Sequence, residues 1–120
     1  MTDGSGHALS TLDYHVLTAM ADGPRYGYDV RDAVEAESGG TLTPRAGSLY
    51  RVLSRLMGAG LVEEVAPPPG AEPHPGRPRR YYGLTEGGRV ALAAEARRLR
   101  EAAALAEERL RRLEGRSGPD

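Results

Sequence analysis

The 120-residue sequence contains no cysteine, no tryptophan, no phenylalanine and no lysine. Without cysteine, the chain can form neither disulfides nor thiolate metal sites, and it cannot use a cysteine nucleophile. No apolar run approaches the roughly 18 residues of a membrane-spanning helix, and the N-terminus lacks the basic-then-apolar pattern of a signal peptide. These absences favour a cytoplasmic protein. The length of 120 residues predicts one small domain with a modest core.

Acidic residues are missing from one particular segment. The formal net charge is only −1, so total charge does not indicate a polyanionic partner. Residues 1–40 hold seven acidic residues and two arginines, whereas residues 41–60 hold three arginines and no acidic residue. A solvated helix usually mixes charges, because pairs at i,i+4 spacing stabilise it by about 0.2–0.5 kcal/mol each. The segment is therefore a candidate for contact with a polyanion.

Apolar periodicity predicts three helices in the first half of the chain. The first begins near Ser10, and the second runs from about Arg25 to Ser38. We expect the third helix to begin with Thr43 as its N-cap and Pro44 as its first helical residue. It should end at the glycines of residues 58–60, which are typical of helix C-termini.

Two short strands should follow, Leu61–Ala66 and Arg80–Leu84. The segment between them, PPPGAEPHPGRP, is too rich in proline for a helix or a strand. It is also longer than the usual hairpin loop of about 2–5 residues. We expect an extended, mobile loop with polyproline character. A docking motif for a proline-binding module is the alternative.

A long last helix should begin at Thr85 as its cap, with Glu86 at the positive end of the helix dipole. Small and apolar residues recur in it at heptad spacing over about three heptads. In so small a chain this stripe predicts a partner helix, and a solvated helix is the alternative. The residues expected at this helix–helix interface are Leu92, Ala96, Leu99, Ala103, Ala106, Leu110 and Leu113.

The outward face of the third helix should carry only small, hydroxyl and arginine side chains, with Tyr50 at its boundary. Gly47 should lie inside this helix, where a glycine costs about 1 kcal/mol of stability relative to alanine. Such a glycine has a purpose if a bulky partner must approach the helix backbone. Together with the positive helix end, this face suits phosphates and base edges in a major groove. A solvated helix with an incidental glycine is the alternative. The candidate DNA-binding residues are Thr43, Arg45, Gly47, Ser48, Tyr50, Arg51 and Arg55.

Three arginines, Arg77, Arg79 and Arg80, stand where the proline-rich loop re-enters a strand. Surface arginine clusters are common, so these residues alone are weak evidence. Next to the third helix, they indicate a DNA-binding wing. The expected fold is mainly α with a small β-hairpin, arranged as a winged helix-turn-helix with a long C-terminal dimerisation helix. The expected boundaries are a disordered tail at 1–8, the winged helix-turn-helix domain at 9–84, the dimerisation helix at 85–114 and a disordered tail at 115–120.

Three segments resemble the PadR family of transcriptional regulators: YGYDV, TPRAGSLYRVLSRLMGAGLVEE and GRPRRYYGLTEGGRVAL. The matching positions are Gly27-Tyr28, Leu49-Tyr50, Gly60-Leu61, Gly76-Arg77-Pro78 with Arg80, Tyr81-Tyr82, and Leu84-Thr85 with Gly88. The resemblance extends roughly from Leu12 to Leu113, and the joint spacing is highly specific. It implies a homodimeric repressor that binds operator DNA and uses its C-terminal helix for dimerisation, as in the short members of the family.

The resemblance also implies control by a small aromatic or hydrophobic effector. Some members stack a flat ligand between tryptophans of the dimer interface. This chain has no tryptophan and no phenylalanine, so that mode of binding has no matching residue. The wing is also longer and richer in proline than is usual in the family.

Other functions have less support in the sequence. A winged-helix module that binds proteins instead of DNA would tend to carry acidic residues on its third helix. We find no Ser/His/Asp arrangement, phosphate-binding glycine loop or plausible carboxylate pair, so an enzyme is not expected. The three histidines lack metal-ligand spacing, and no metal or cofactor is expected. Tyr28, Tyr50, Tyr81 and Tyr82 either pack or bind phosphate. Tyr50 is favoured for a phosphate contact or for a hydrogen bond across helices, because its boundary position leaves the hydroxyl free.

Overall fold

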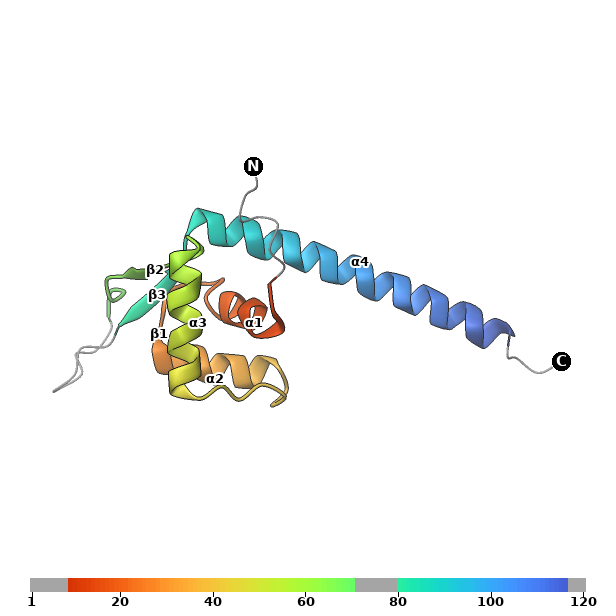
Figure 1. The fold of residues 1–120 in the computed structure, drawn as a ribbon, viewed down its shortest axis with the longest axis horizontal. Coiled ribbons are helices and arrows are strands. Elements are labelled where there is room, and N and C mark those ends of the chain that lie inside the picture. Colours follow the sequence, from red (N-terminus) through yellow and green to blue (C-terminus); the bar gives the residue numbers. More distant parts are fainter. Residues whose placement is uncertain (1–8, 71–79, 117–120) are drawn as a thin grey trace.

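In the computed structural model, which describes residues 9–70 and 80–116, α1 (Thr11–Ala19) begins directly after Ser10 (Figure 1). The hydroxyl of Ser10 accepts a hydrogen bond from the backbone N–H of Asp13 at 3.0 Å. In return, the Asp13 carboxylate accepts one from the Ser10 N–H at 3.2 Å. This reciprocal capping box satisfies two free donors at the helix start and confirms the predicted beginning of the helix.

The predicted second helix is shorter than expected. Arg25 and Tyr26 form a short strand, β1 (Arg25–Tyr26), and only then does α2 (Gly27–Glu37) begin. β1 pairs antiparallel with β3 (Tyr81–Leu84), with Arg25 opposite Tyr82 and Tyr26 opposite Tyr81. The prediction of helix at these two residues was wrong because a distant strand supplies their pairing partners. The expected hairpin is consequently a three-stranded sheet in the order β1-β3-β2, in which β2 is Val62–Val65.

α3 (Ala46–Gly58) begins later than predicted. Its N-cap is Arg45, and the backbone N–H of Leu49 donates to the carbonyl of Arg45 at 2.9 Å. Thr43 is therefore not the cap, and the buried Pro44 precedes the helix. Gly47 is the second helical residue and not one turn inside, so the penalty for a mid-helix glycine mostly does not apply. At the other end, α3 stops at Gly58, as the glycines predict.

The two predicted strands are present within two residues of their expected ends. β2 (Val62–Val65) pairs antiparallel with β3, from Val62 opposite Leu84 to Val65 opposite Tyr81. Most of the proline-rich loop between them falls on residues 71–79, which lie outside the described residues.

α4 (Glu86–Arg116) begins after Thr85, whose hydroxyl accepts a hydrogen bond from the Gly88 N–H at 2.9 Å. Thr85 is thus the predicted cap. The helix continues to Arg116, two residues beyond its expected end. Figure 1 shows that α4 passes over the body formed by α1 to α3 and then extends far beyond it. The tail predicted at 115–120 was therefore wrong at residues 115 and 116, which are helical. The predicted tail at 1–8 and residues 117–120 lie outside the described residues.

The core lies between α1, α2 and α3 and is closed by the sheet. Its buried members are mostly aliphatic: Val16, Leu17, Ala19, Met20, Val30, Val34, Leu49, Val52, Leu53, Leu56, Val62 and Tyr82. Leu92 of α4 packs against this cluster from outside. The mainly helical fold with a small sheet and a long final helix confirms the predicted class, and it leaves the outer face of α3 uncovered (Figure 1).

Candidate nucleic-acid interface

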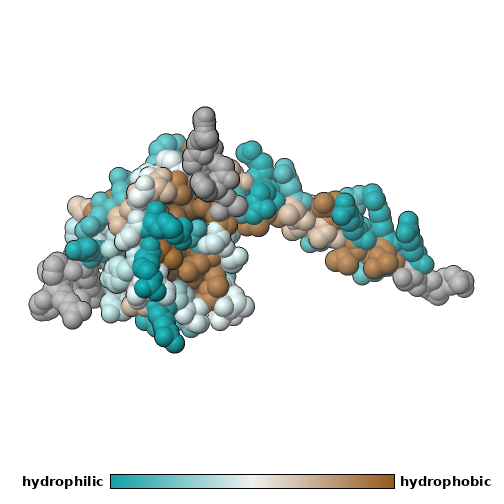
Figure 2. Space-filling model, viewed as in Figure 1, coloured by the Kyte–Doolittle hydropathy of each residue, from teal (hydrophilic) through white to brown (hydrophobic). Residues whose placement is uncertain are grey.

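The outer face of α3 is hydrophilic, open and free of acidic side chains. Its inner face is buried through Leu49, Val52, Leu53 and Leu56. Figure 2 shows a hydrophilic band that runs down the body over this helix. A Cβ atom added to Gly47 would meet nothing within 4 Å, so the backbone of the first turn is accessible from outside.

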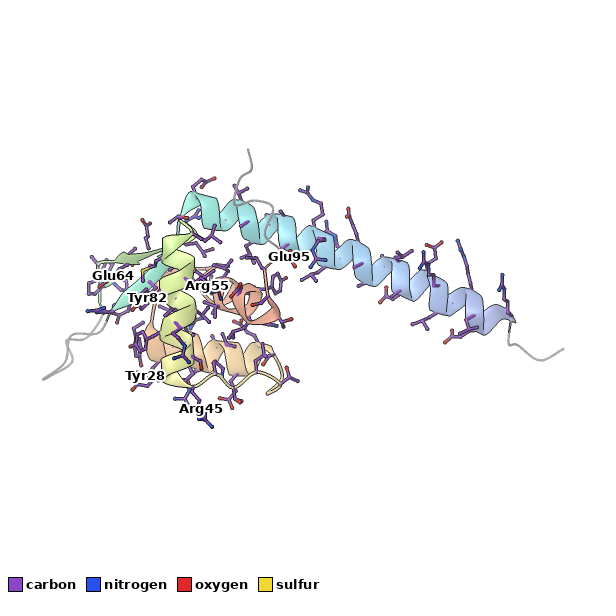
Figure 3. The ribbon with its side chains drawn as sticks, viewed as in Figure 1. Tyr28, Arg45, Arg55, Glu64, Tyr82 and Glu95 are labelled. Atoms are coloured by element: carbon purple, nitrogen blue, oxygen red, sulfur yellow. The ribbon has the colours of Figure 1, made fainter. Side chains whose placement is uncertain are left out.

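Two arginines of this face point to solvent without an acidic partner. Among the ion pairs found in the described residues, none involves Arg45 or Arg51. Within residues 9–70 and 80–116, the only hydrogen bond found for Arg51 is a long one to the hydroxyl of Ser48, at 3.5 Å. In Figure 3, Arg45 extends away from the body at the N-terminal end of α3. These two guanidinium groups are available to an anionic partner.

Arg55 differs from this pattern, because its partner comes from α1. Its guanidinium donates two hydrogen bonds to the carboxylate of Asp13, Nη2 to Oδ1 at 2.6 Å and Nη1 to Oδ2 at 3.2 Å. The side chain of Asp13 is 6% exposed and that of Arg55 is 57% exposed. The expectation that the arginines of this helix are unpaired was therefore wrong at Arg55. The acidic residue lies 42 positions earlier in the chain, beyond the reach of any local pattern.

The environment keeps both groups of this pair charged. Burial by itself would raise the pKa of Asp13, but the hydrogen bonds from Arg55 and from Ser10 outweigh it. The pKa of Asp13 consequently lies below its ordinary value. The hydrogen bond to Asp13 in turn raises the pKa of Arg55. The two-point contact fixes the orientation of the guanidinium and leaves its remaining N–H groups directed elsewhere.

The structure separates the four candidate tyrosines into two pairs. Tyr81 and Tyr82 are buried, and burial raises the pKa of the Tyr82 hydroxyl, so both are packing residues. Tyr28 and Tyr50 are 55% and 47% exposed at the junction of α2 and α3. A Cβ on Gly27 would lie 3.3 Å from the hydroxyl oxygen of Tyr50, so this glycine lets Tyr50 lie close over the first turn of α2.

Sequence reasoning missed two residues of this region. Arg31 is exposed on α2 and helps to line a small hollow between the first turns of α2 and α3. Its position one turn after Gly27-Tyr28 was the available signal. The second is Asp13, the buried partner of Arg55. An acidic residue three positions after Ser10 indicated a capping box, but no spacing rule connects it to α3.

Of the three wing arginines, the structure describes Arg80, which is exposed and directly precedes β3. Arg77 and Arg79 lie outside the described residues. The described part of the candidate interface therefore comprises the outer face of α3, the start of α2 and the base of the wing.

Comparison with known proteins identifies the family. The sequence profile of the PadR-like family of transcriptional regulators matches residues 16–94, which include the capped start of α4. The chain belongs to this family. Its members are transcriptional regulators and not enzymes.

Solved structures of PadR-family proteins have the same fold. A PadR family regulator from Clostridium difficile is 20% identical, with a TM-score of 0.66 over 84% of this chain and 99% of the other. Bacillus subtilis PadR, solved in complex with operator DNA, is 22% identical, with a TM-score of 0.57 over 71% of this chain and 46% of that chain. An uncharacterised protein of a Streptomyces fradiae transposon is 42% identical over 81 residues, which make up 68% of this chain. The match spans only 21% of the length of that relative.

In this PadR-family chain, the distal half of α4 exposes its apolar side chains. Leu110 and Leu113 are 57% and 58% exposed, and Figure 2 shows hydrophobic patches along the projecting helix. Leu92, by contrast, packs against the core of its own chain and is only partly available to a partner. Leu105 is also an exposed leucine, but it lies off the predicted heptad positions.

Within residues 9–70 and 80–116 of this regulator, no three His, Cys, Asp or Glu side chains are grouped so that they could hold a metal ion. No helix in the same described part is long and apolar enough to cross a membrane.

Proposed function

We propose that the protein is a sequence-specific DNA-binding regulator that acts in the cytoplasm as a homodimer on a pseudo-palindromic operator. The observation that carries this proposal is the outer face of α3. Within the described residues it presents Arg45 and Arg51 without acidic partners, beside a first turn whose backbone is open at Gly47. An amphipathic helix with such a face fits the width and the acceptor pattern of a major groove.

Each candidate residue at the N-cap and on the outer face of α3 has a proposed role in this contact. Arg51 reaches a guanine edge or a phosphate from the centre of the exposed face. Arg45 meets a phosphate at the positive end of the helix. Gly47 and Ser48 allow the DNA backbone to approach closely, and the hydroxyl of Tyr50 donates to a phosphate at the edge of the face.

The flanking residues would position the helix on the duplex. Thr43 precedes the helix on the exposed side and supplies a hydroxyl to the same backbone. The wing residues Arg77, Arg79 and Arg80 would contact phosphates beside the half-site. Phosphate contacts of this kind fix register without reading sequence.

Arg55 has a more restricted role than Arg51. Two of its nitrogens already donate to Asp13, so its orientation is fixed before DNA arrives. A side chain held in this way cannot turn to follow a base edge. We therefore assign Arg55 to a phosphate contact made with its remaining N–H groups.

Dimerisation would place two α3 helices in successive major grooves, about 34 Å apart. The exposed stripe of α4 supports this arrangement, because monomeric proteins seldom leave a row of leucines in water. The proposed contact residues are Ala96, Leu99, Ala103, Ala106, Leu110 and Leu113, with Leu92 at the edge of the contact. Bound in this way, the protein represses transcription by occupying its operator, and a small aromatic or hydrophobic effector in the dimer interface releases it.

The test first searches the DNA next to the protein's own coding region for an inverted repeat. It then compares a duplex that carries this repeat with a random duplex of equal length. Arg51→Ala should weaken binding to the repeat by about 1–3 kcal/mol if the contact is to a base, with a smaller loss on the random duplex. Arg112→Ala is the matched control, because it removes the same charge from an exposed pair near the end of α4.

Gel shifts over a salt series distinguish a base contact of Arg51 from a phosphate contact. Loss of one phosphate contact lowers the salt slope by about one unit without changing specificity. Equal affinities of the two variants would remove Arg51 from the interface. If the unaltered protein bound neither duplex in dilute buffer, DNA binding itself would be refuted and a protein-interaction role favoured.

A further inference from the structure

The start of α4 is hydrogen-bonded to the turn that ends α3. The hydroxyl of Thr85 donates to the carbonyl oxygen of Gly60 at 2.6 Å. The backbone N–H of Thr85 donates to the carbonyl oxygen of Leu61 at 3.1 Å. The same hydroxyl accepts from the N–H of Gly88 at 2.9 Å, so one side chain joins both elements.

Gly88 brings the two elements into direct contact. A Cβ atom at this position would overlap the carbonyl oxygen of Leu61, which is backbone and cannot rotate away. The neighbouring Gly87 is nearly as close, with an added Cβ 3.3 Å from the carbonyl oxygen of Gly60. The helix backbone of α4 therefore lies directly on these two carbonyl groups, without a side chain between them.

The other side of the same turn is bonded to α3. Gly60 adopts a left-handed conformation with φ +79°. Its N–H donates to the carbonyl of Met57, and the N–H of Leu61 donates to the carbonyl of Leu56, both at 3.0 Å. These two bonds form the Schellman motif that closes a helix. Gly60 and Leu61 thus direct their N–H groups to α3 and their carbonyl groups to α4.

We propose that Thr85 and Gly88 form a rigid joint that determines the spacing between operator half-sites. This inference rests on the proposed function, in which α4 carries the dimer contact and α3 enters the groove. Neither residue lies among the proposed DNA contacts. They act as positioning residues, because they set the angle between the helix that pairs the protomers and the helix that binds DNA.

The length of α4 makes this angle important. With a rise of about 1.5 Å per residue, Leu110 lies roughly 33 Å along the helix from Gly88. A rotation of about 10° at the joint would shift that point by about 6 Å relative to α3. This shift approaches the rise of two base pairs, about 3.4 Å each. A loosened joint should therefore admit several half-site spacings, whereas a rigid joint selects one.

The experiment measures affinity for duplexes in which the distance between the two half-sites is changed by about one or two base pairs. A duplex with a single half-site is included. The full-length protein is compared with Thr85→Val, which keeps the shape of the side chain and removes both hydroxyl hydrogen bonds. Ser10→Ala is the matched control, because it also removes an N-cap hydroxyl, from α1, without touching the joint.

We expect the unaltered protein to prefer one spacing at least tenfold, and Thr85→Val to reduce this preference about fivefold with unchanged affinity for a single half-site. Ser10→Ala should lower the melting temperature and retain the spacing preference. If its melting curve shows that Gly88→Ala is folded, this variant should reduce the spacing preference as Thr85→Val does. If Gly88→Ala is unfolded, the test depends on Thr85→Val alone. If Thr85→Val and Ser10→Ala showed the same dependence of affinity on half-site spacing, the proposal that Thr85 and Gly88 form a rigid joint would be refuted. An unaltered protein that binds all spacings equally would also refute it, although DNA binding itself would then stand.

Discussion

Replacing Asp13 by asparagine removes the charge that holds Arg55 and keeps the shape of the side chain. Asparagine has a single acceptor oxygen, and its NH2 group takes the place of the other one. It therefore cannot accept both guanidinium hydrogen bonds of the observed two-point contact. The substitution therefore removes the negative charge together with one acceptor of the two-point contact that joins α1 to α3.

The size of the effect follows from the exposure of the two partners. Hydrogen bonds to charged groups contribute about 1.5–3 kcal/mol when they are buried, whereas exposed ion pairs contribute about 0–1 kcal/mol. Asp13 is almost fully buried but Arg55 is 57% exposed, so solvent screens part of the attraction. We expect Asp13→Asn to lower the free energy of unfolding by about 1–2 kcal/mol. For a chain of this size, that corresponds to a fall in Tm of roughly 4–8 °C.

The contribution should also depend on pH. The pKa of Asp13 is lower in the folded protein than its unfolded value of about 3.9. Its stabilising effect is therefore complete above about pH 4 and is lost as the pH falls through the folded pKa. The difference in unfolding free energy between the unaltered protein and Asp13→Asn should be constant near neutrality and should shrink in acid.

The assay is denaturant unfolding of four proteins at one protein concentration: the unaltered chain, Asp13→Asn, Arg55→Gln and the double variant. Fixed concentration is needed because the proposed dimerisation would make apparent stability concentration-dependent. We expect a coupling energy of about 1 kcal/mol from this double-mutant cycle. The exposed Glu108–Arg112 pair of α4 is the control and should give no more than about 0.5 kcal/mol. A coupling energy no larger than that of the control, or a difference that persists in acid, would refute the reasoning.

Further predictions concern the contact between Gly27 and Tyr50 and the exposed leucines of α4. Gly27→Ala would place a Cβ 3.3 Å from the Tyr50 hydroxyl oxygen, so the ring tip must shift. We expect less than about 1 kcal/mol of destabilisation and a several-fold loss of operator affinity, shared by Tyr50→Phe in a gel shift. Normal affinity in both variants would exclude the phosphate contact of Tyr50. Leu110→Glu should weaken dimerisation by about 2–3 kcal/mol, or roughly a hundredfold, measured by sedimentation equilibrium. An unchanged dissociation constant would place the dimer contact elsewhere.

Much of the fold was predictable because its signals are local in the chain. Ser10 and Thr85 cap helices through hydrogen bonds that span three residues, and such spacings are visible in the sequence. The buried face of α3 repeats at helical period, which also placed its arginines on the outer face. The start of α3 was the local exception. Thr43-Pro44 is a good helix-start signal, but Pro44 is buried ahead of the helix and Arg45 takes the cap position.

The sequence by itself determined which segments are helical, which face of α3 is cationic and to which family the chain belongs. The first two properties depend on residues that are neighbours along the chain, and the family assignment depends on the spacing of motifs along the sequence. Only the tertiary structure decided that Arg25 and Tyr26 join the sheet, that Asp13 holds Arg55, and that the backbone of α4 lies on the turn after α3. The physical reason is that these contacts join groups up to 57 positions apart. Such contacts form only when the core brings the elements together, so local periodicity and capping patterns do not predict them.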